Sequence, residues 1–172
     1  MPNQPFDLSR SLTHRLHTLA KLTDRVTEAA YRRDAGIGFS EGRCLAAIGA
    51  FSPLSVNDLA GRSNLNKAQA SRGAQTLVDQ GLVIKATSPT DKRAVVLTLS
   101  PSGQAVWHRL ASVIAQRNHD ITRCLSDSER QTLSTLIDKL VKHAHTAVTV
   151  ARVTAQPPKD STPASTPPCA EP

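Results

Sequence analysis

The sequence is poor in aromatic side chains: its 172 residues include one Trp, one Tyr and three Phe. A hydrophobic core must therefore be assembled mainly from Leu, Val, Ile and Ala, which favours the packing of helices. The chain is long enough for one domain with a core of its own, and barely long enough for two.

Cysteines are also scarce and widely spaced, at Cys44, Cys124 and Cys169. This spacing indicates neither a disulfide framework nor a zinc knuckle. The first residues lack the apolar core of a secretory signal, and no hydrophobic run approaches membrane-spanning length. We therefore expect a cytoplasmic protein with no membrane partner.

Motifs of the common enzyme classes are missing from the chain. It has no Gly-rich phosphate loop, no nucleophile elbow and no HExxH pair, and its carboxylates form no recognisable catalytic pair. We expect no enzymatic activity, no catalytic residues and no cofactor. The formal net charge of +7 favours a nucleic-acid or anionic partner without deciding the matter.

Two short amphipathic helices joined by a turn are predicted between Ser55 and Gly81. Ser55 followed by Asp58 resembles a capping box, and Asn66 followed by Gln69 caps the second helix. Gly81 supplies the C-terminal stop of that helix. Apolar residues recur at helical spacing inside it and predict its buried side: Ala70, Ala74, Leu77 and Val78.

The opposite side of the second helix carries side chains that can contact DNA. Long hydrogen-bonding side chains near a helix N-terminus reach base edges, and Arg and Lys also bind phosphates. The same helix pair occurs elsewhere as plain scaffold, so the helix alone predicts either a DNA contact or an ordinary surface. The residues concerned are Lys67, Gln69, Ser71, Arg72 and Gln75.

Two strands are predicted next, at Leu82–Thr87 and Ala94–Leu99, because both segments are rich in β-branched residues. The turn between them contains Asp91 and places Lys92 and Arg93 at its projecting end. A cationic hairpin directly after such a helix is typical of a winged helix-turn-helix, whose tip arginine can enter the minor groove. The combination favours DNA binding.

Long amphipathic helices are predicted on both sides of this region. Apolar residues between Leu8 and Ala30 recur at steps of three and four and predict one helix that ends near Gly36. A shorter helix is expected from Glu41 to Phe51, with Phe51 on its apolar side. Further helices are expected after Pro101 and after a capping box of Ser126 and Glu129. A second copy of the chain would bury the surplus apolar faces.

The sequence resembles the MarR family of bacterial transcriptional regulators. The resemblance covers about residues 8–150 and rests on DLA at 58–60, KAQASRGAQTLVDQGLV at 67–83 and TDKRAVVLTLSPSGQ at 90–104. It implies a mainly α fold with a small β-hairpin wing: a winged helix-turn-helix domain plus N- and C-terminal dimerisation helices.

The resemblance also implies an organisation of the chain. A single MarR-like domain would span 1–155, with the winged helix-turn-helix at about 55–99 and dimerisation helices at about 6–33 and 102–150. The first and last helices would intertwine in a homodimer whose two wings span a near-palindromic operator in double-stranded DNA. The Pro/Ser/Thr-rich tail at 156–172 is predicted to be disordered.

Similar regulators commonly bind a small aromatic or phenolic acid between the first two helices and the DNA-binding lobe. Arg pairs with a carboxylate in a bidentate manner, and His can bond a ring hydroxyl. The resemblance therefore implies a repressor of catabolic or resistance genes that such an acid releases from DNA. Asp91 would orient the basic residues of the wing. The effector-binding candidates are His14, Arg15, His17 and Arg43.

Three alternatives remain open at the level of sequence. His14 and His17 share a helix face, as a pair of metal ligands would, but no Cys or Glu cluster lies near them in the sequence. A thiol sensor would rest on Cys44 or Cys124, since residues 6–35 contain no Cys. The third alternative is a winged-helix module for DNA architecture or protein interaction, without effector control.

Overall fold

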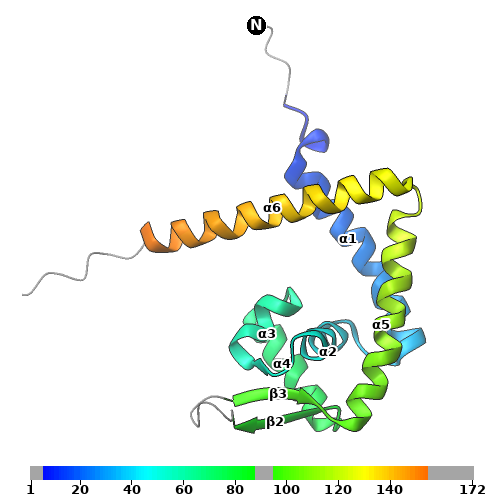
Figure 1. The fold of residues 1–172 in the computed structure, drawn as a ribbon, viewed down its shortest axis with the longest axis vertical. Helices are drawn as coiled ribbons and strands as arrows, with labels where there is room; N and C mark the ends of the chain where they lie inside the picture. Colours follow the sequence, from blue (N-terminus) through cyan, green and yellow to red (C-terminus); the bar gives the residue numbers. More distant parts are fainter. Residues whose placement is uncertain (1–5, 88–94, 155–172) are drawn as a thin grey trace, which may run out of the picture. The chain divides into compact units, whose positions relative to one another are not determined.

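The computed structural model describes residues 6–87 and 95–154. The chain forms two compact units, one ending at Arg123 and the other beginning at Cys124. The first unit contains the helix-turn-helix and its sheet (Figure 1). Its helical elements are η1 (Leu8–Arg10), α1 (Leu12–Ala30), η2 (Tyr31–Ala35), α2 (Phe39–Phe51), α3 (Val56–Ser63), α4 (Lys67–Asp79) and α5 (Pro101–Thr122).

The first long helix begins later than the apolar pattern predicts. The Asp7 carboxylate accepts a hydrogen bond from the Ser9 N–H at 2.9 Å and closes a separate 3-10 turn, η1. Ser11 is then extended, and α1 starts at Leu12. The prediction of one helix from Leu8 is wrong because the local Asp7 cap competes with the helix. The predicted stop is confirmed, since Gly36 ends the π-helical turn η2 with φ 67°.

The helix-turn-helix forms as its capping residues predict. The Ser55 hydroxyl accepts from the Asp58 N–H at 3.1 Å and starts α3. The Asn66 side chain accepts from the Gln69 N–H at 2.9 Å, while the side-chain Oε1 of Gln69 accepts from the Asn66 N–H, which completes a capping box. Gly81, with φ 69°, follows α4. Both predicted helices are confirmed.

The sheet has one strand more than the sequence pattern predicts. Its strands run antiparallel in the order β1 (Leu54–Ser55), β3 (Val95–Leu99), β2 (Val83–Thr87). Leu54 pairs with Leu97 across the sheet. The two wing strands are confirmed, whereas β1 was not predicted because two residues cannot display an alternating pattern. The wing tip and the tail from residue 155 lie outside the described residues.

The core is aliphatic, as the scarcity of aromatic residues requires. The α2 helix lies at its centre and contacts α3, α4, α5 and β3. The prediction that Phe51 points into this core is wrong: its side chain is exposed, because it is the last residue of α2 and its ring lies under the Arg62 guanidinium. The largest fully buried side chains are Leu45, Ile48, Leu59, Leu77, Leu97 and Leu110.

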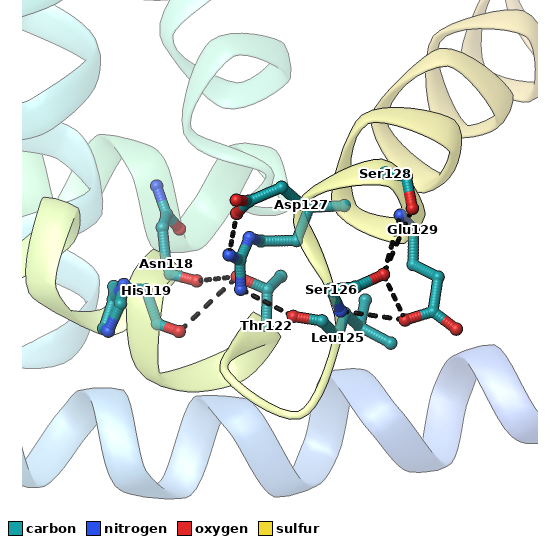
Figure 2. A network of polar contacts seen from close by, with 9 residues as sticks. Asn118, His119, Thr122, Leu125, Ser126, Asp127, Ser128 and Glu129 are labelled. Atoms are coloured by element: carbon teal, nitrogen blue, oxygen red, sulfur yellow. Dashed lines mark hydrogen bonds and ion pairs between the residues drawn. The ribbon is translucent and has the colours of Figure 1, made fainter.

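The second unit contains α6 (Asp127–Thr154). Figure 2 includes the polar contacts of the residues at the start of this helix. The Glu129 carboxylate accepts from the Ser126 N–H at 2.8 Å, and the Ser126 hydroxyl accepts from the Glu129 N–H at 3.4 Å. These contacts with Ser126 lower the pKa of the Glu129 carboxyl. Arg130 pairs with Asp127 and donates to the Leu125 carbonyl at 2.7 Å. The predicted capping box is confirmed.

Within the described residues, two helices each carry an exposed apolar stripe. On each helix most of the stripe residues are about half exposed, which is unusual for large apolar side chains repeated along one helix. In α1 the stripe consists of Leu12, Leu16, Leu19, Leu22 and Val26. In α6 it consists of Leu133, Leu136, Ile137, Leu140, Val141 and Val148.

Across 6–87 and 95–154, every helix falls short of the combined length and apolarity that crossing a bilayer would require. The cytoplasmic location stays a prediction from the sequence.

Cys44 is one of the tightly packed residues of the core. Its side chain is fully buried, and the thiol donates a weak hydrogen bond to the Ala70 carbonyl at 3.8 Å. A Cβ at Gly73 of α4 would lie 2.9 Å from the Cys44 sulfur, so the two helices approach closely at this point. Burial, followed by the charge of Glu41, raises the pKa of the Cys44 thiol to about 11. The thiolate needed for redox sensing is therefore disfavoured at Cys44.

We expect Cys44 to resist thiol reagents in the folded protein. In a Cys124→Ser/Cys169→Ser variant, where Cys44 is the remaining thiol, labelling by a disulfide reagent in mildly alkaline buffer should be slow until denaturant unfolds the chain. The measurement is the absorbance of released thiolate against time, with the Cys44→Ser/Cys169→Ser variant as the control that keeps the exposed Cys124. Equal native-state rates would contradict the burial argument and restore the thiol-sensor alternative.

Candidate functional site

The outward side of α4 forms the first part of the candidate site. Ala70, Gly73, Ala74 and Leu77 are buried, and they fix the helix against α2 and α3. The opposite side faces solvent. All five residues that the sequence analysis singled out on this helix are exposed: Lys67, Gln69, Ser71, Arg72 and Gln75. We refer to these five residues as the α4 face.

Two members of the α4 face already have partners within α4 and its cap. The Gln69 side chain belongs to the capping box with Asn66, and the Gln75 amide donates to the Asp79 carboxylate at 2.7 Å. Lys67 and Arg72 form no ion pair with any residue in the described part of the chain. These two cations are therefore available to an anionic partner.

The hairpin of β2 and β3 follows α4 and contributes a further cation. Lys85 of β2 lines a small groove together with Ser71 and Gln75 of the α4 face. The sequence analysis missed Lys85 because its position beside α4 depends on how the strand packs, not on local spacing. The predicted wing residues Asp91, Lys92 and Arg93 lie outside the described residues, so their roles stay predictions.

The second part of the candidate site is a cavity of about 300 Å³ that is lined by residues of η2, α2, α3 and α5. Tyr31, Phe51 and Trp107 contribute aromatic surface to it, and Arg43 and Arg62 contribute positive charge. The Arg62 guanidinium stacks on the Phe51 ring at 4.6 Å from its centre. Burial raises the pKa of the Tyr31 phenol, which keeps it neutral. A cavity with aromatic walls and two guanidinium groups suits an aromatic anion.

Arg43 is the residue that joins this cavity to α1. Its Nη2 donates to the Asp24 carboxylate at 2.8 Å, and its guanidinium carbon lies 4.4 Å from the centre of the Phe39 ring. The other three predicted effector residues, His14, Arg15 and His17, are exposed on α1 and are not among the residues that line the cavity. Their role in ligand binding stays a prediction.

A larger cavity of about 420 Å³ lies between α1, η2 and α5. Its surface is mainly apolar, and Val26 links it to the exposed stripe of α1. Its lining includes the carboxylates that pair with its cations, Arg33 with Asp34 at 2.7 Å and Arg117 with Asp120 at 2.9 Å. None of the residues that line the cavity at Arg43 is acidic, so that cavity suits an anion better.

Metal-ligating residues do not gather in the described part of the chain, where no group of three or more His, Cys, Asp and Glu side chains could hold a metal ion. In particular, the Nδ1 of His17 lies 2.9 Å from the Thr13 carbonyl of its own helix.

Comparison with known proteins bears on the identity of this fold. The family model described as "MarR family" matches residues 35–94. A protein named for transcriptional regulation of the hcr operon of Thauera aromatica is 30% identical over 89 residues, which cover 52% of this chain. The match spans about half of that relative, 54% of its length.

Solved structures share the fold at lower identity. BpsR of Bordetella bronchiseptica, whose structure concerns regulation of DNA binding by 6-hydroxynicotinic acid, aligns with a TM-score of 0.71 and 20% identity, covering 80% of this chain and 98% of that one. PcaV of Streptomyces coelicolor, solved with its natural ligand, aligns with a TM-score of 0.64 and 21% identity, covering 82% and 99%. The winged helix-turn-helix fold is thereby confirmed. Over residues 35–94, which hold its helix-turn-helix, the chain is similar to the MarR family.

Proposed function

We propose that this protein is a DNA-binding transcriptional regulator in which the α4 face enters the major groove. The observation that carries the proposal is that Lys67, Ser71 and Arg72 are exposed near the start of a helix whose other side is fixed in the core. Such a helix can present side chains to bases and phosphates without losing its own packing. Lys92 and Arg93 of the wing tip are proposed to reach the minor groove, with Asp91 orienting them.

Replacing Arg72 with Ala should weaken binding to a duplex that the wild-type protein selects from random-sequence DNA. If Arg72 contacts a base, the affinity should fall about tenfold, and the variant should lose its sequence preference at one position of the site. If it contacts phosphate, the salt dependence of binding should fall by about one unit of slope. Fluorescence anisotropy over a range of salt concentrations distinguishes the two outcomes.

The matched control is Arg32→Ala, which removes an exposed arginine that pairs with Glu28, away from the α4 face. It should bind the duplex as the wild type does. Equal affinities of wild type and Arg72→Ala, or selection that enriches no sequence, would favour the module for architecture or protein interaction.

We further propose that the protein acts as a homodimer held by the stripes of α1 and α6. Contact between two copies would remove these apolar side chains from water, which would stabilise the dimer. Two copies related by a two-fold axis would present two α4 faces to successive major grooves, about 34 Å apart. This arrangement accounts for the expectation of a near-palindromic operator.

Light scattering at micromolar concentration should report the mass of a dimer. A charge within the stripe, as in Leu140→Glu, should shift the protein toward the monomer because the carboxylate would have to be desolvated in the interface. Lys139→Glu introduces the same side chain at the neighbouring position outside the stripe and should leave the dimer intact. A folded monomer of the wild-type protein would overturn the dimer.

We propose a small aromatic acid as the effector, bound in the cavity at Arg43. The guanidinium of Arg43 can pair with a carboxylate, while Trp107 and Phe51 supply aromatic surface for the ring. The 6-hydroxynicotinic acid named for BpsR, and the solution of PcaV with its natural ligand, support a small molecule as the effector. Release of a repressor from DNA would follow from a shift in population toward the ligand-bound shape.

The single Trp of the chain, Trp107, lines the cavity, so its fluorescence reports on the site. Titration with benzoate should give a saturable change in Trp107 fluorescence and release of the selected duplex over the same concentration range. Arg43→Ala should weaken benzoate binding by at least tenfold, and Arg15→Ala tests the contribution of the α1 residues. Benzyl alcohol, which has the ring without the charge, is the control ligand. No response to any benzoate-type acid would overturn this effector class.

A further inference from the structure

A single guanidinium group connects α1 to the turn of the helix-turn-helix. Arg43 of α2 donates through Nη2 to the Asp24 carboxylate of α1 at 2.8 Å. Through Nη1 it makes a long hydrogen bond of 3.5 Å to the backbone carbonyl of Asn64. We refer to these two hydrogen bonds as the Arg43 bridge. Its partners are 19 and 21 residues away in the sequence.

The Asn64 end of the bridge lies in the turn that joins α3 to α4. Asn64 follows α3 in the left-handed conformation, with φ 53°, and only Leu65 and Asn66 separate it from α4. A non-glycine residue tolerates this conformation where its surroundings hold it. A change in the hydrogen bond to the Asn64 carbonyl therefore acts directly on the turn between the two helices.

Arg43 is more easily redirected than its neighbours. The Tyr31 ring beside it is buried and packs directly against the α2 backbone, since a Cβ at Gly42 would lie 2.5 Å from that ring. Arg43 itself borders the cavity, and its side chain is 29% exposed. Asp24 is 41% exposed and is not among the cavity-lining residues. If the Arg43–Asp24 ion pair opened, water could solvate the Asp24 carboxylate at little cost.

We propose that Asp24 is an internal competitor of the effector carboxylate, and that the two acids exclude one another on Arg43. An acid bound in the cavity takes the guanidinium from Asp24 and strains or breaks its bond to Asn64, which disconnects α1 from the turn before α4. This inference rests on the proposed function, in which the cavity accepts an organic acid. It assigns a positioning role to Asp24, a residue outside the cavity lining.

The competition has a thermodynamic consequence in both directions. A ligand shifts the DNA-binding equilibrium only through its different affinity for the two arrangements of the bridge. By linkage, a substitution that weakens the Arg43 bridge must raise the affinity for the ligand and lower the population of the DNA-binding shape. A neutral aromatic ligand, which has no carboxylate for Arg43, should be insensitive to the state of the bridge.

The decisive experiment compares Asp24→Asn with the wild type in the full-length protein. Removing the competing charge should raise the affinity for benzoate, followed through Trp107 fluorescence, about fivefold. Without ligand, the same variant should bind the selected duplex several-fold more weakly. Benzyl alcohol should affect both proteins equally. A benzoate affinity for Asp24→Asn equal to or below that of the wild type would overturn the competition.

Glu28→Gln is the matched control, because Glu28 also pairs with an arginine through an exposed ion pair, at 2.8 Å, one turn further along α1. It should leave both affinities unchanged. Asp24→Glu keeps the carboxylate and should restore most of the wild-type behaviour, which a general defect in folding would not allow. Circular dichroism melting of each variant checks that the fold is intact.

The design separates failure of this inference from failure of the effector proposal. If the wild-type protein responds to no aromatic acid, the effector proposal fails, and the ligand-free DNA measurement still tests the bridge. In that case weaker DNA binding by Asp24→Asn than by Glu28→Gln supports the link from α1 to the turn. Equal DNA binding by these two variants overturns it.

Discussion

The structure depends on how α2 packs in the first unit. One side of α2 buries Cys44, Leu45 and Ile48 against the neighbouring helices and β3. Cys44 lies so close to Gly73 of α4 that a larger residue at position 73 would force the two helices apart. The packing of α4 against α2 is therefore close, and it fixes which side of α4 faces solvent.

The residue next to Cys44 has the opposite character. Arg43 is half-buried and is held by polar contacts that water or a ligand can replace, namely an ion pair with Asp24 and a long hydrogen bond to the Asn64 carbonyl. Adjacent residues of one helix thus supply a rigid contact and an exchangeable contact to the same helix-turn-helix. This pairing would suit the proposed regulator, because the α4 face would keep its packing while its connection to α1 changed with a ligand.

Much of the helix-turn-helix and its wing could be predicted from local sequence signals. The capping box of Asn66 and Gln69, the stop at Gly81 and the strand pattern of the wing each depend on residues a few positions apart. By contrast, Asp24, Arg62, Lys85 and Trp107 were missed as site residues. Each becomes relevant only through a neighbour from another element, and single-sequence spacing carries no signal for such a contact.

The sequence by itself determined the order and type of the main helices and of the two wing strands, the aliphatic composition of the core and the polar side of α4, because propensity, capping and periodicity act over a few residues. Only the tertiary structure decided three contacts. Phe51 lies under the Arg62 guanidinium and outside the core, Cys44 packs against Gly73, and Arg43 forms an ion pair with Asp24. These contacts depend on the distances between packed helices, which are set by the volumes of many side chains together.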